Sequence, residues 1–184
     1  MNRIAIVAFS TLSLLACGKS DSGGGSSKAA EGTKAEAKPQ APIELTETVD
    51  LGAAVTDPDV TSYKGLKAKA PKDVKLEAGL TGVQINLAGA GGFELSKAFD
   101  AGYVAKIKGQ ASSSKLDKLV KFHVDTPAAI LWESASELGG DNNFNFAAEV
   151  KVGEVSFKCG SEGYGRHTKV EAEALLKICQ SITK

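Results

Sequence analysis

The 184-residue sequence carries no excess of either charge, because 22 lysine and arginine residues balance 22 aspartate and glutamate residues. It has no stretch in which basic residues alternate with aromatic ones, as nucleic-acid-binding surfaces often do. It also has no internal repeat and, after its first residues, no apolar segment long enough to span a bilayer. We therefore expect no nucleic-acid partner and no second segment in a membrane.

Cysteine and histidine are scarce, with three and two residues in the chain. Structural zinc sites usually contain closely spaced pairs such as Cys-x-x-Cys or His-x-x-x-His, and the sequence has neither. Cys159, Glu162 and His167 mix metal-ligand types without that spacing. His123 is expected to lie near a backbone carbonyl at a helix end rather than to bind a metal. The sequence therefore predicts no metal site and no cofactor.

The sequence does have a distinctive N-terminus. Arg3 supplies a positive charge, and the apolar run over residues 4–15 is too short to remain as a membrane span, which is typical of a secretory signal. The run leads into the tetrapeptide Leu14-Leu15-Ala16-Cys17. An ordinary buried cysteine is the alternative for Cys17. The glycine- and serine-rich segment that follows, however, gives this side chain nothing to pack against.

The tetrapeptide resembles the lipobox of bacterial lipoproteins, in which a small residue directly precedes the cysteine that is modified. The resemblance implies that residues 1–16 are removed, that the Cys17 thiol gains a thioether-linked diacylglycerol, and that the new amino group is acylated. Two or more acyl chains would anchor the protein firmly to a membrane of the cell envelope. In that family aspartate after the cysteine favours the inner membrane, so Gly18 weakly favours the outer one.

The rest of the chain divides into two parts. Residues 17–42 consist mostly of Gly, Ser, Ala, Lys, Glu and Pro and have no large apolar side chain. Such a segment cannot offset the entropy of ordering, so it is predicted to be a disordered tether. Residues 43–184 are enough for one hydrophobic core and too few for two comfortable domains. We expect one globular domain there.

Alternation of apolar and polar residues predicts an α+β fold, a mostly antiparallel sheet with two helices packed on it. Strands are expected in the ranges 43–51, 66–70, 74–76, 83–87, 93–95, 103–107 and 129–134. The last of these ranges is apolar on both faces and should lie inside the sheet. The glycine run over residues 89–92 is expected to be a hairpin tip rather than a phosphate loop, because a strand follows it.

The strongest pattern is a hairpin near the C-terminus. Apolar residues alternate over 144–152 and again over 155–159, with Gly153-Glu154 as a two-residue turn between them. This turn places Val152 opposite Val155 and Ala148 opposite Cys159. All of these side chains should point to one face of the sheet.

A second helix is predicted to begin at Thr168, where Thr168 and Glu171 form a capping box. Its apolar stripe includes Cys179, and the hairpin register turns Cys159 towards the same core. Because an exported protein meets oxidising conditions, the sequence predicts a disulfide between Cys159 and Cys179. Two buried free cysteines are the alternative.

The first helix is predicted to follow the serine run Ser112-Ser113-Ser114. Ser114 and Asp117 would cap it, in a variant of the capping box. Its apolar face would consist of Leu116, Leu119, Val120 and His123.

Two features of this region bear on function. Lys115, Lys118 and Lys121 would form a positive row on the exposed side of the helix, either as a solvated face or as a contact for anionic headgroups, lipopolysaccharide phosphates or an acidic partner. Ser112 and Lys115 also match Ser-x-x-Lys, in which a lysine can deprotonate the serine, as in penicillin-binding proteins and β-lactamases. The other motifs of that group are poorly matched, so a helix cap explains these residues more simply.

These observations favour a lipid-anchored, non-enzymatic envelope protein that binds a partner or supports the cell surface. One alternative is a small serine hydrolase that uses residues 112–115. The other is a carrier for an apolar ligand, which would need a sizeable pocket between the sheet and a helix.

Overall fold

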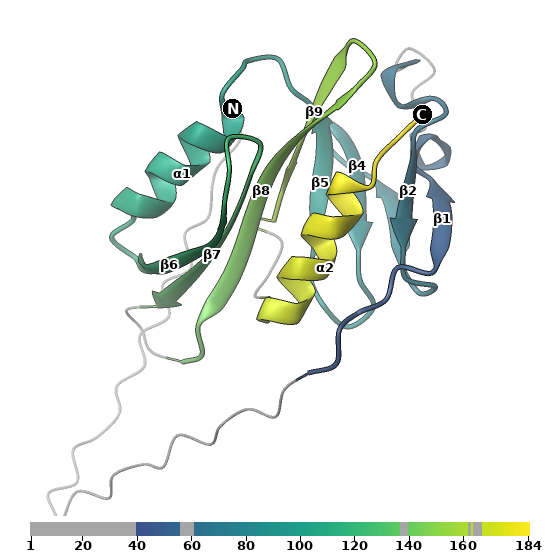
Figure 1. The fold of residues 1–184 in the computed structure, drawn as a ribbon. Helices are drawn as coiled ribbons and strands as arrows, with labels where there is room; N and C mark the ends of the chain where they lie inside the picture. Colours follow the sequence, from purple (N-terminus) through teal and green to yellow (C-terminus); the bar gives the residue numbers. More distant parts are fainter. Residues whose placement is uncertain (1–39, 56–60, 137–139, 162, 164–166) are drawn as a thin grey trace, which may run out of the picture. The chain divides into compact units, whose positions relative to one another are not determined.

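Strands that pair with their neighbours in sequence build most of the fold (Figure 1). The computed structural model describes residues 40–55, 61–136, 140–161, 163 and 167–184. In these residues seven strands form one antiparallel sheet in the order β3-β4-β5-β9-β8-β7-β6. They are β3 (Lys75–Ala78), β4 (Gly82–Asn86), β5 (Gly92–Lys97), β6 (Asp117–Asp125), β7 (Ala129–Ser136), β8 (Asn143–Val152) and β9 (Val155–Gly160).

The sheet consists of two meanders that meet in its middle. One contains β3, β4 and β5, the other contains β6 to β9, and they join where Leu95 of β5 lies opposite Cys159 of β9. Helix α1 (Tyr103–Ser113) carries the chain from β5 to β6 at the sheet edge. The second helix is α2 (Lys169–Gln180). The predicted α+β class, a mostly antiparallel sheet with two helices, is confirmed.

A separate two-stranded sheet precedes this one in the chain. It pairs β1 (Glu47–Asp50) with β2 (Lys67–Ala70), and the short 3-10 helices η1 (Leu51–Ala54) and η2 (Thr61–Tyr63) lie between these strands in sequence. The lipobox tetrapeptide and most of the predicted tether lie outside the described residues. Only residues 40–42 of that tether are described, and they are exposed and form no helix or strand.

The two helices cover opposite faces of the sheet. Successive residues of a strand point to opposite faces, and in β7 Leu131 joins the core beneath α2 while Ile130 and Trp132 join a smaller cluster beneath α1. The α2 core is large and is built around Phe93, Phe146, Phe157, Leu175 and Ile178. The α1 cluster contains Val104, Ile107, Ala111, Ile130, Trp132 and Ala147. Strand β7 is therefore interior and buried on both faces, as its sequence predicts.

The C-terminal hairpin forms in the predicted register. Val152 lies opposite Val155 and Ala148 opposite Cys159. The turn residue Gly153 has a φ of 63°, a conformation that glycine adopts without a steric penalty. The turn after β4 also matches its prediction, since β4 and β5 pair as an antiparallel hairpin around residues 87–91.

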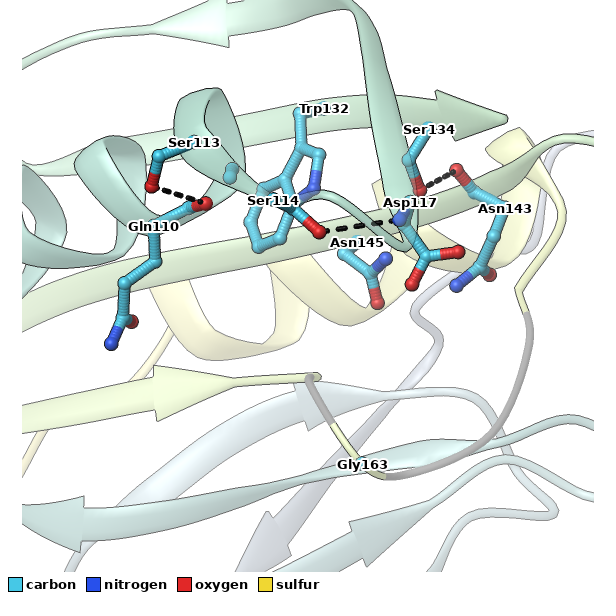
Figure 2. A pocket seen from close by; sticks show the side chains of 10 residues that line it. Gln110, Ser113, Ser114, Asp117, Trp132, Ser134, Asn143, Asn145 and Gly163 are labelled. Atoms are coloured by element: carbon cyan, nitrogen blue, oxygen red, sulfur yellow. Dashed lines mark hydrogen bonds between the residues drawn. The ribbon is translucent and has the colours of Figure 1, made fainter. Parts of the chain in front are cut away.

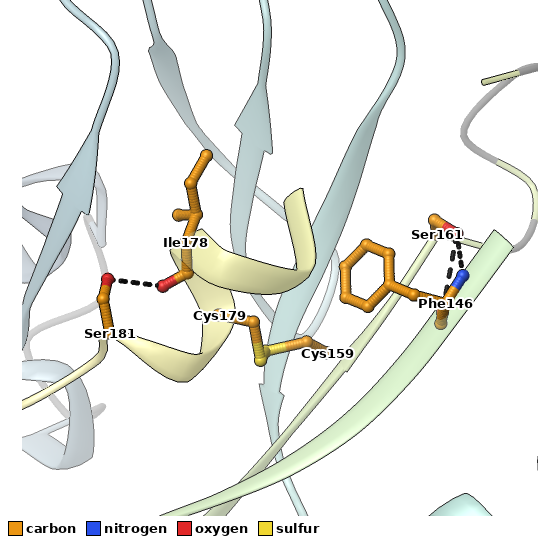
Figure 3. Close-up of a disulfide and its surroundings, with 6 residues drawn as sticks. All are labelled: Phe146, Cys159, Ser161, Ile178, Cys179 and Ser181. Carbon is orange, nitrogen blue, oxygen red and sulfur yellow. Dashed lines mark hydrogen bonds between the residues drawn. A yellow bond between two sulfur atoms is a disulfide. The ribbon is translucent and has the colours of Figure 1, made fainter. Parts of the chain in front are cut away.

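The predicted disulfide is present (Figure 3). Cys159 of β9 and Cys179 of α2 are joined by an S–S bond of 2.05 Å, and both residues are fully buried. The capping box also forms as predicted. The Thr168 hydroxyl accepts a hydrogen bond from the Glu171 N–H, and the Glu171 carboxylate accepts one from the Thr168 N–H at 2.7 Å. Helix α2 is thus fixed at its start by the cap and near its end by the covalent bridge.

One predicted strand is in fact a helix. Residues 103–107 begin α1, and its buried side chains are Val104, Ile107 and Ala111. Their spacing of three and four residues is the helical period. The strand prediction for this segment was wrong because it ended at residue 107. It therefore left out Ala111, the third buried residue of the helical stripe.

The opposite error affects the predicted first helix, which is the edge strand β6. Register shifts interrupt its pairing with β7 between Leu119 and Lys121 and between Phe122 and Val124. Each bulge adds one residue, so Leu119 and Phe122 both reach the α1 face although they are three apart. This spacing imitates a helix. Leu116 and Val120, predicted to be buried on that helix, are 77% and 50% exposed.

The predicted row of lysines is consequently not a helical one. Lys115 lies in the turn after α1, while Lys118 and Lys121 lie on β6 opposite Ala135 and Glu133. A role for these three lysines in contacting an anionic partner stays a prediction.

Candidate functional site

An open groove lies at the C-terminal end of α1, between that helix and the sheet (Figure 2). It has a volume of about 480 Å³, which falls in the size range of small-molecule sites. Helix α1 supplies Gln110, Ala111 and Ser113, the turn after it supplies Ser114, and β6 begins with Asp117. The strands beneath supply Trp132 and Ser134 from β7 and Asn143 and Asn145 from β8, and Gly163 is also among the described lining residues.

The strand pattern explains why polar side chains meet here. Trp132 and Ser134 are two residues apart on β7, and Asn143 and Asn145 are two apart on β8, so all four point to the α1 face. The register places Trp132 directly opposite Asn145 and Ser134 opposite Asn143. These adjacent pairs form a continuous polar floor where the apolar cluster beneath α1 ends.

Contacts along α1 hold the helix in place over the apolar part of this face. The Glu149 carboxylate of β8 accepts a hydrogen bond from the Tyr103 N–H at the first residue of the helix. Further along, the Lys108 ammonium forms a salt bridge with Asp125 of β6 at 2.7 Å. The helix ends at Ser113, so it does not cover the last residues of β7 or the first residues of β8. The groove lies over these residues.

The floor of the groove is buried and polar. Trp132 is 3% exposed, Ser134 is 2% exposed and Asn145 is 8% exposed. The Ser134 hydroxyl donates a long hydrogen bond of 3.4 Å to the Asn143 carbonyl, and the Asn145 side-chain oxygen accepts one of 3.4 Å from the Ser161 hydroxyl. Among the described residues, no hydrogen-bond partner is found for the Trp132 indole N–H or for the Asn145 amide nitrogen. These groups line the groove with unused donors.

The serine run of the sequence lies at the rim of this groove, but its hydroxyl groups serve the backbone. Ser112 donates to the Lys108 carbonyl at 2.9 Å and Ser113 to the Gly109 carbonyl at 2.9 Å. Ser114 accepts from the Asp117 N–H at 3.2 Å, which closes the turn into β6 rather than capping a helix. No described contact brings Lys115 or another base to these hydroxyls, as nucleophilic catalysis requires.

A second polar cluster lies on the other face of the sheet. His123 Nε2 of β6 is 2.8 Å from Glu133 Oε2 of β7, and the other Glu133 oxygen accepts a hydrogen bond from the Asn142 amide. Burial alone raises the pKa of Glu133, but the hydrogen bonds from His123 and Asn142, with the positive charges of His123 and Lys121, lower it overall. The sequence prediction that His123 ends a helix is therefore wrong. The cluster links β6, β7 and the residue directly before β8.

His167 is the other titratable group inside the protein. It is 2% exposed, directly before α2, and neither ring nitrogen has a hydrogen-bond partner among the described residues. Burial lowers its pKa, and the nearby Glu171 carboxylate and the backbone of Gly92 and Phe144 only partly oppose this effect. His167 is thus held neutral at pH 7. Of the other two residues with metal-ligand side chains near it in sequence, Cys159 is in the disulfide and Glu162 lies outside the described residues.

The described residues contain no cluster of three or more side chains that could hold a metal ion. In the same part of the chain, no helix is both long enough and apolar enough to cross a bilayer.

The sequence pointed to the serine run at the groove, but it did not identify Trp132, Asn143 and Asn145 as a set. Their proximity depends on the β7–β8 register. No protein-family model matches the chain, and neither a curated protein nor a solved structure matches it.

Proposed function

We propose that this chain is a lipid-anchored, non-catalytic binding module of the bacterial cell envelope, which holds its ligand in the groove at the end of α1. The observation that carries the proposal is the groove's buried floor. The Trp132 indole N–H and the Asn145 amide nitrogen have no partner among the described residues and are not among the fully buried polar atoms, so they border the groove as free donors. A ligand that accepts from both would gain hydrogen bonds there.

Two features support the location. The tetrapeptide Leu14-Leu15-Ala16-Cys17 resembles a lipobox, and the remaining cysteines, Cys159 and Cys179, form a disulfide in the folded domain. Disulfides persist in oxidising compartments, which agrees with export. An acylated Cys17 at the start of the predicted tether would hold the domain near a membrane surface.

The lining of the groove argues against the other two functions. A hydrolase needs a base on its nucleophile, whereas the hydroxyls of Ser112 and Ser113 donate to helix carbonyls. A carrier for an apolar ligand needs a mostly apolar pocket, and this groove is floored by amide, hydroxyl and indole N–H groups.

The anchor is tested by expressing the full chain and the Cys17→Ser variant in a Gram-negative host and measuring intact mass and membrane partition. We expect acyl mass on a chain that begins at Cys17, and its loss in the variant. Ser20→Ala is the matched control and should be acylated normally. A mature N-terminus elsewhere without acyl groups would contradict the anchor. Stoichiometric labelling of Ser112, Ser113 or Ser114 by a fluorophosphonate probe would contradict the non-catalytic part.

A further inference from the structure

We propose that the groove at the end of α1 binds an uncharged, polyhydroxylated ligand, namely a carbohydrate chain. This inference rests on the proposed binding function and adds the chemical class of the ligand. It follows from the charge of the lining, from the kind of hydrogen-bonding groups present, and from the burial of the floor.

Charge removes most other ligand classes. The described lining residues include no lysine, arginine or histidine, and the carboxylate of Asp117 at the rim is the one charged side chain among them. Phosphates, sulfates and acidic peptides would meet no positive partner and one negative group among these residues, so they are disfavoured. A single exposed carboxylate is also a weak site for a cation, since exposed ion pairs contribute little. The ligand that fits is polar and neutral.

The hydrogen-bonding groups then favour hydroxyls. Gln110, Asn143 and Asn145 each carry an amide that both donates and accepts, and Asp117 accepts through two oxygens. Sugar hydroxyls also donate and accept, and adjacent ones on a ring can pair with the two atoms of one amide or carboxylate. Serine hydroxyls at positions 113, 114 and 134 add further groups of both kinds. This density of neutral donors and acceptors matches a carbohydrate better than a peptide, whose polar groups are farther apart.

Trp132 supplies the observation that points to a bound ligand. Its side chain is almost fully buried, but its N–H is not among the fully buried polar atoms and has no partner among the described residues, so it borders the groove (Figure 2). A buried tryptophan usually finds an acceptor for this group. Since the residue lines the groove opposite Asn145, a ligand hydroxyl there can accept from the indole and also bond the amide.

The same lining indicates binding without cleavage. Glycosidases in most families use two carboxyl groups, about 5–10 Å apart on either side of the scissile bond. Asp117 is the only carboxylate among the lining residues of this groove that the structure describes. The described lining therefore lacks the paired carboxyl groups of a glycosidase, and we expect the carbohydrate to be bound without cleavage.

The chain contains one tryptophan, and it lies in this groove, so intrinsic fluorescence reports directly on binding. The full-length protein in detergent micelles would be titrated with two saccharide probes, cellohexaose for neutral hexoses and chitohexaose for N-acetylated sugars. Inositol hexakisphosphate and an acetylated, amidated Gly-Ser hexapeptide serve as anionic and peptide probes. We expect a saturable change in Trp132 emission with at least one saccharide and none with the other two probes.

Variants separate the groove from the rest of the molecule. Gln110→Ala should weaken saccharide binding by up to about tenfold, the effect of one lost hydrogen bond. Gln180→Ala, which changes another exposed glutamine, on α2, is the matched control and should bind normally. Asn145→Leu should abolish binding, and circular dichroism would verify its fold. Should that variant not fold, Asp117→Ala at the exposed rim takes its place with an expected loss of binding.

The inference is overturned if neither saccharide changes the emission at millimolar concentration, if the phosphate or peptide probe binds instead, or if Gln110→Ala and Gln180→Ala behave alike. Repeating the titration with Cys17→Ser keeps this result separate from the anchor. Saccharide binding by that variant supports the inference whether or not the wild-type chain is acylated. Binding of the phosphate or peptide probe would retain the binding module and reject only its ligand class.

Discussion

The two faces of the sheet differ in what holds them together. Beneath α2, large aromatic and aliphatic side chains fill a continuous core, and the helix has a complete capping box and a disulfide. Beneath α1, the buried cluster contains only six of the described residues, and the N-cap of the helix is Gly102, which has no side chain to cap it. Its start relies instead on Glu149 from β8.

This difference indicates a division of roles. The α2 face buries many more apolar side chains than the α1 face, so it contributes more of the hydrophobic stabilisation. The α1 face leaves donors of β7 and β8 at the groove without partners among the described residues. A binding groove is expected where such donors remain accessible to a ligand.

The largest expected loss of stability comes from replacing a buried isoleucine by alanine, and this change can be made separately on each face. Ile178→Ala in α2 removes a fully buried side chain, and Ile107→Ala in α1 removes one that is 7% exposed. Leucine and isoleucine to alanine changes in cores cost about 2–5 kcal/mol. We expect Ile178→Ala in the upper half of that range and Ile107→Ala in the lower half, by urea denaturation. Equal losses would remove the division of roles between the faces.

The disulfide gives the next effect and sharpens the comparison further. Replacing Cys159 and Cys179 together by alanine should lower the free energy of unfolding by about 3 kcal/mol, since the bridge closes a short loop of the unfolded chain. Saccharide binding at pH 7 should be retained at temperatures where the variant stays folded, because the bridge lies on the α2 side. Thermal unfolding with and without reductant measures the first effect, and non-reducing peptide mapping checks the bridge itself. Quantitative alkylation of both thiols without reductant would contradict the bridge.

The smallest effect is a dependence on pH that also belongs to the α2 face. The pKa of His167 is lowered from 6.5 by burial, so below pH 6.5 the unfolded chain binds a proton more readily than the folded chain. Stability is therefore complete above that pH and falls as the pH drops below it. His167→Leu should flatten this slope between pH 7 and 5 in urea titrations. If the variant kept the same slope of stability against pH, other titratable groups would be responsible for it. The Glu133 contribution should be lost only at lower pH, because its pKa is lowered from 4.5.

The parts of the fold that could be predicted are those in which local and long-range signals agree. In the C-terminal hairpin, the alternation of apolar residues and the Gly153 turn specify one register, and this register also sets the position of Cys159. The capping box at Thr168 likewise needs only residues three apart. The disulfide followed because both of its partners were placed by such patterns.

The segment between β5 and β7 could not be predicted because its signals conflict. The bulges of β6 give Leu119 and Phe122 a helical spacing, and the start of α1 resembles a short alternating strand. The groove could not be predicted for the same reason. Its rim comes from these two misassigned elements, and its floor depends on which residues of β7 and β8 lie side by side. Single polar residues such as Asn143 and Asn145 carry no such information in the sequence.

The bulges of β6 have a consequence beyond the local register. This nine-residue strand is the last in the order of the described sheet, so its outer edge presents unpaired backbone groups to solvent. A long, regular edge of this kind invites the edge of another molecule and promotes aggregation. Two bulges in one strand bend and twist its edge, and Lys118 and Lys121 add charge, so pairing of a second chain along it is disfavoured. The bulges that give β6 a helix-like spacing of apolar residues thus also help to prevent edge-to-edge association between copies of the protein.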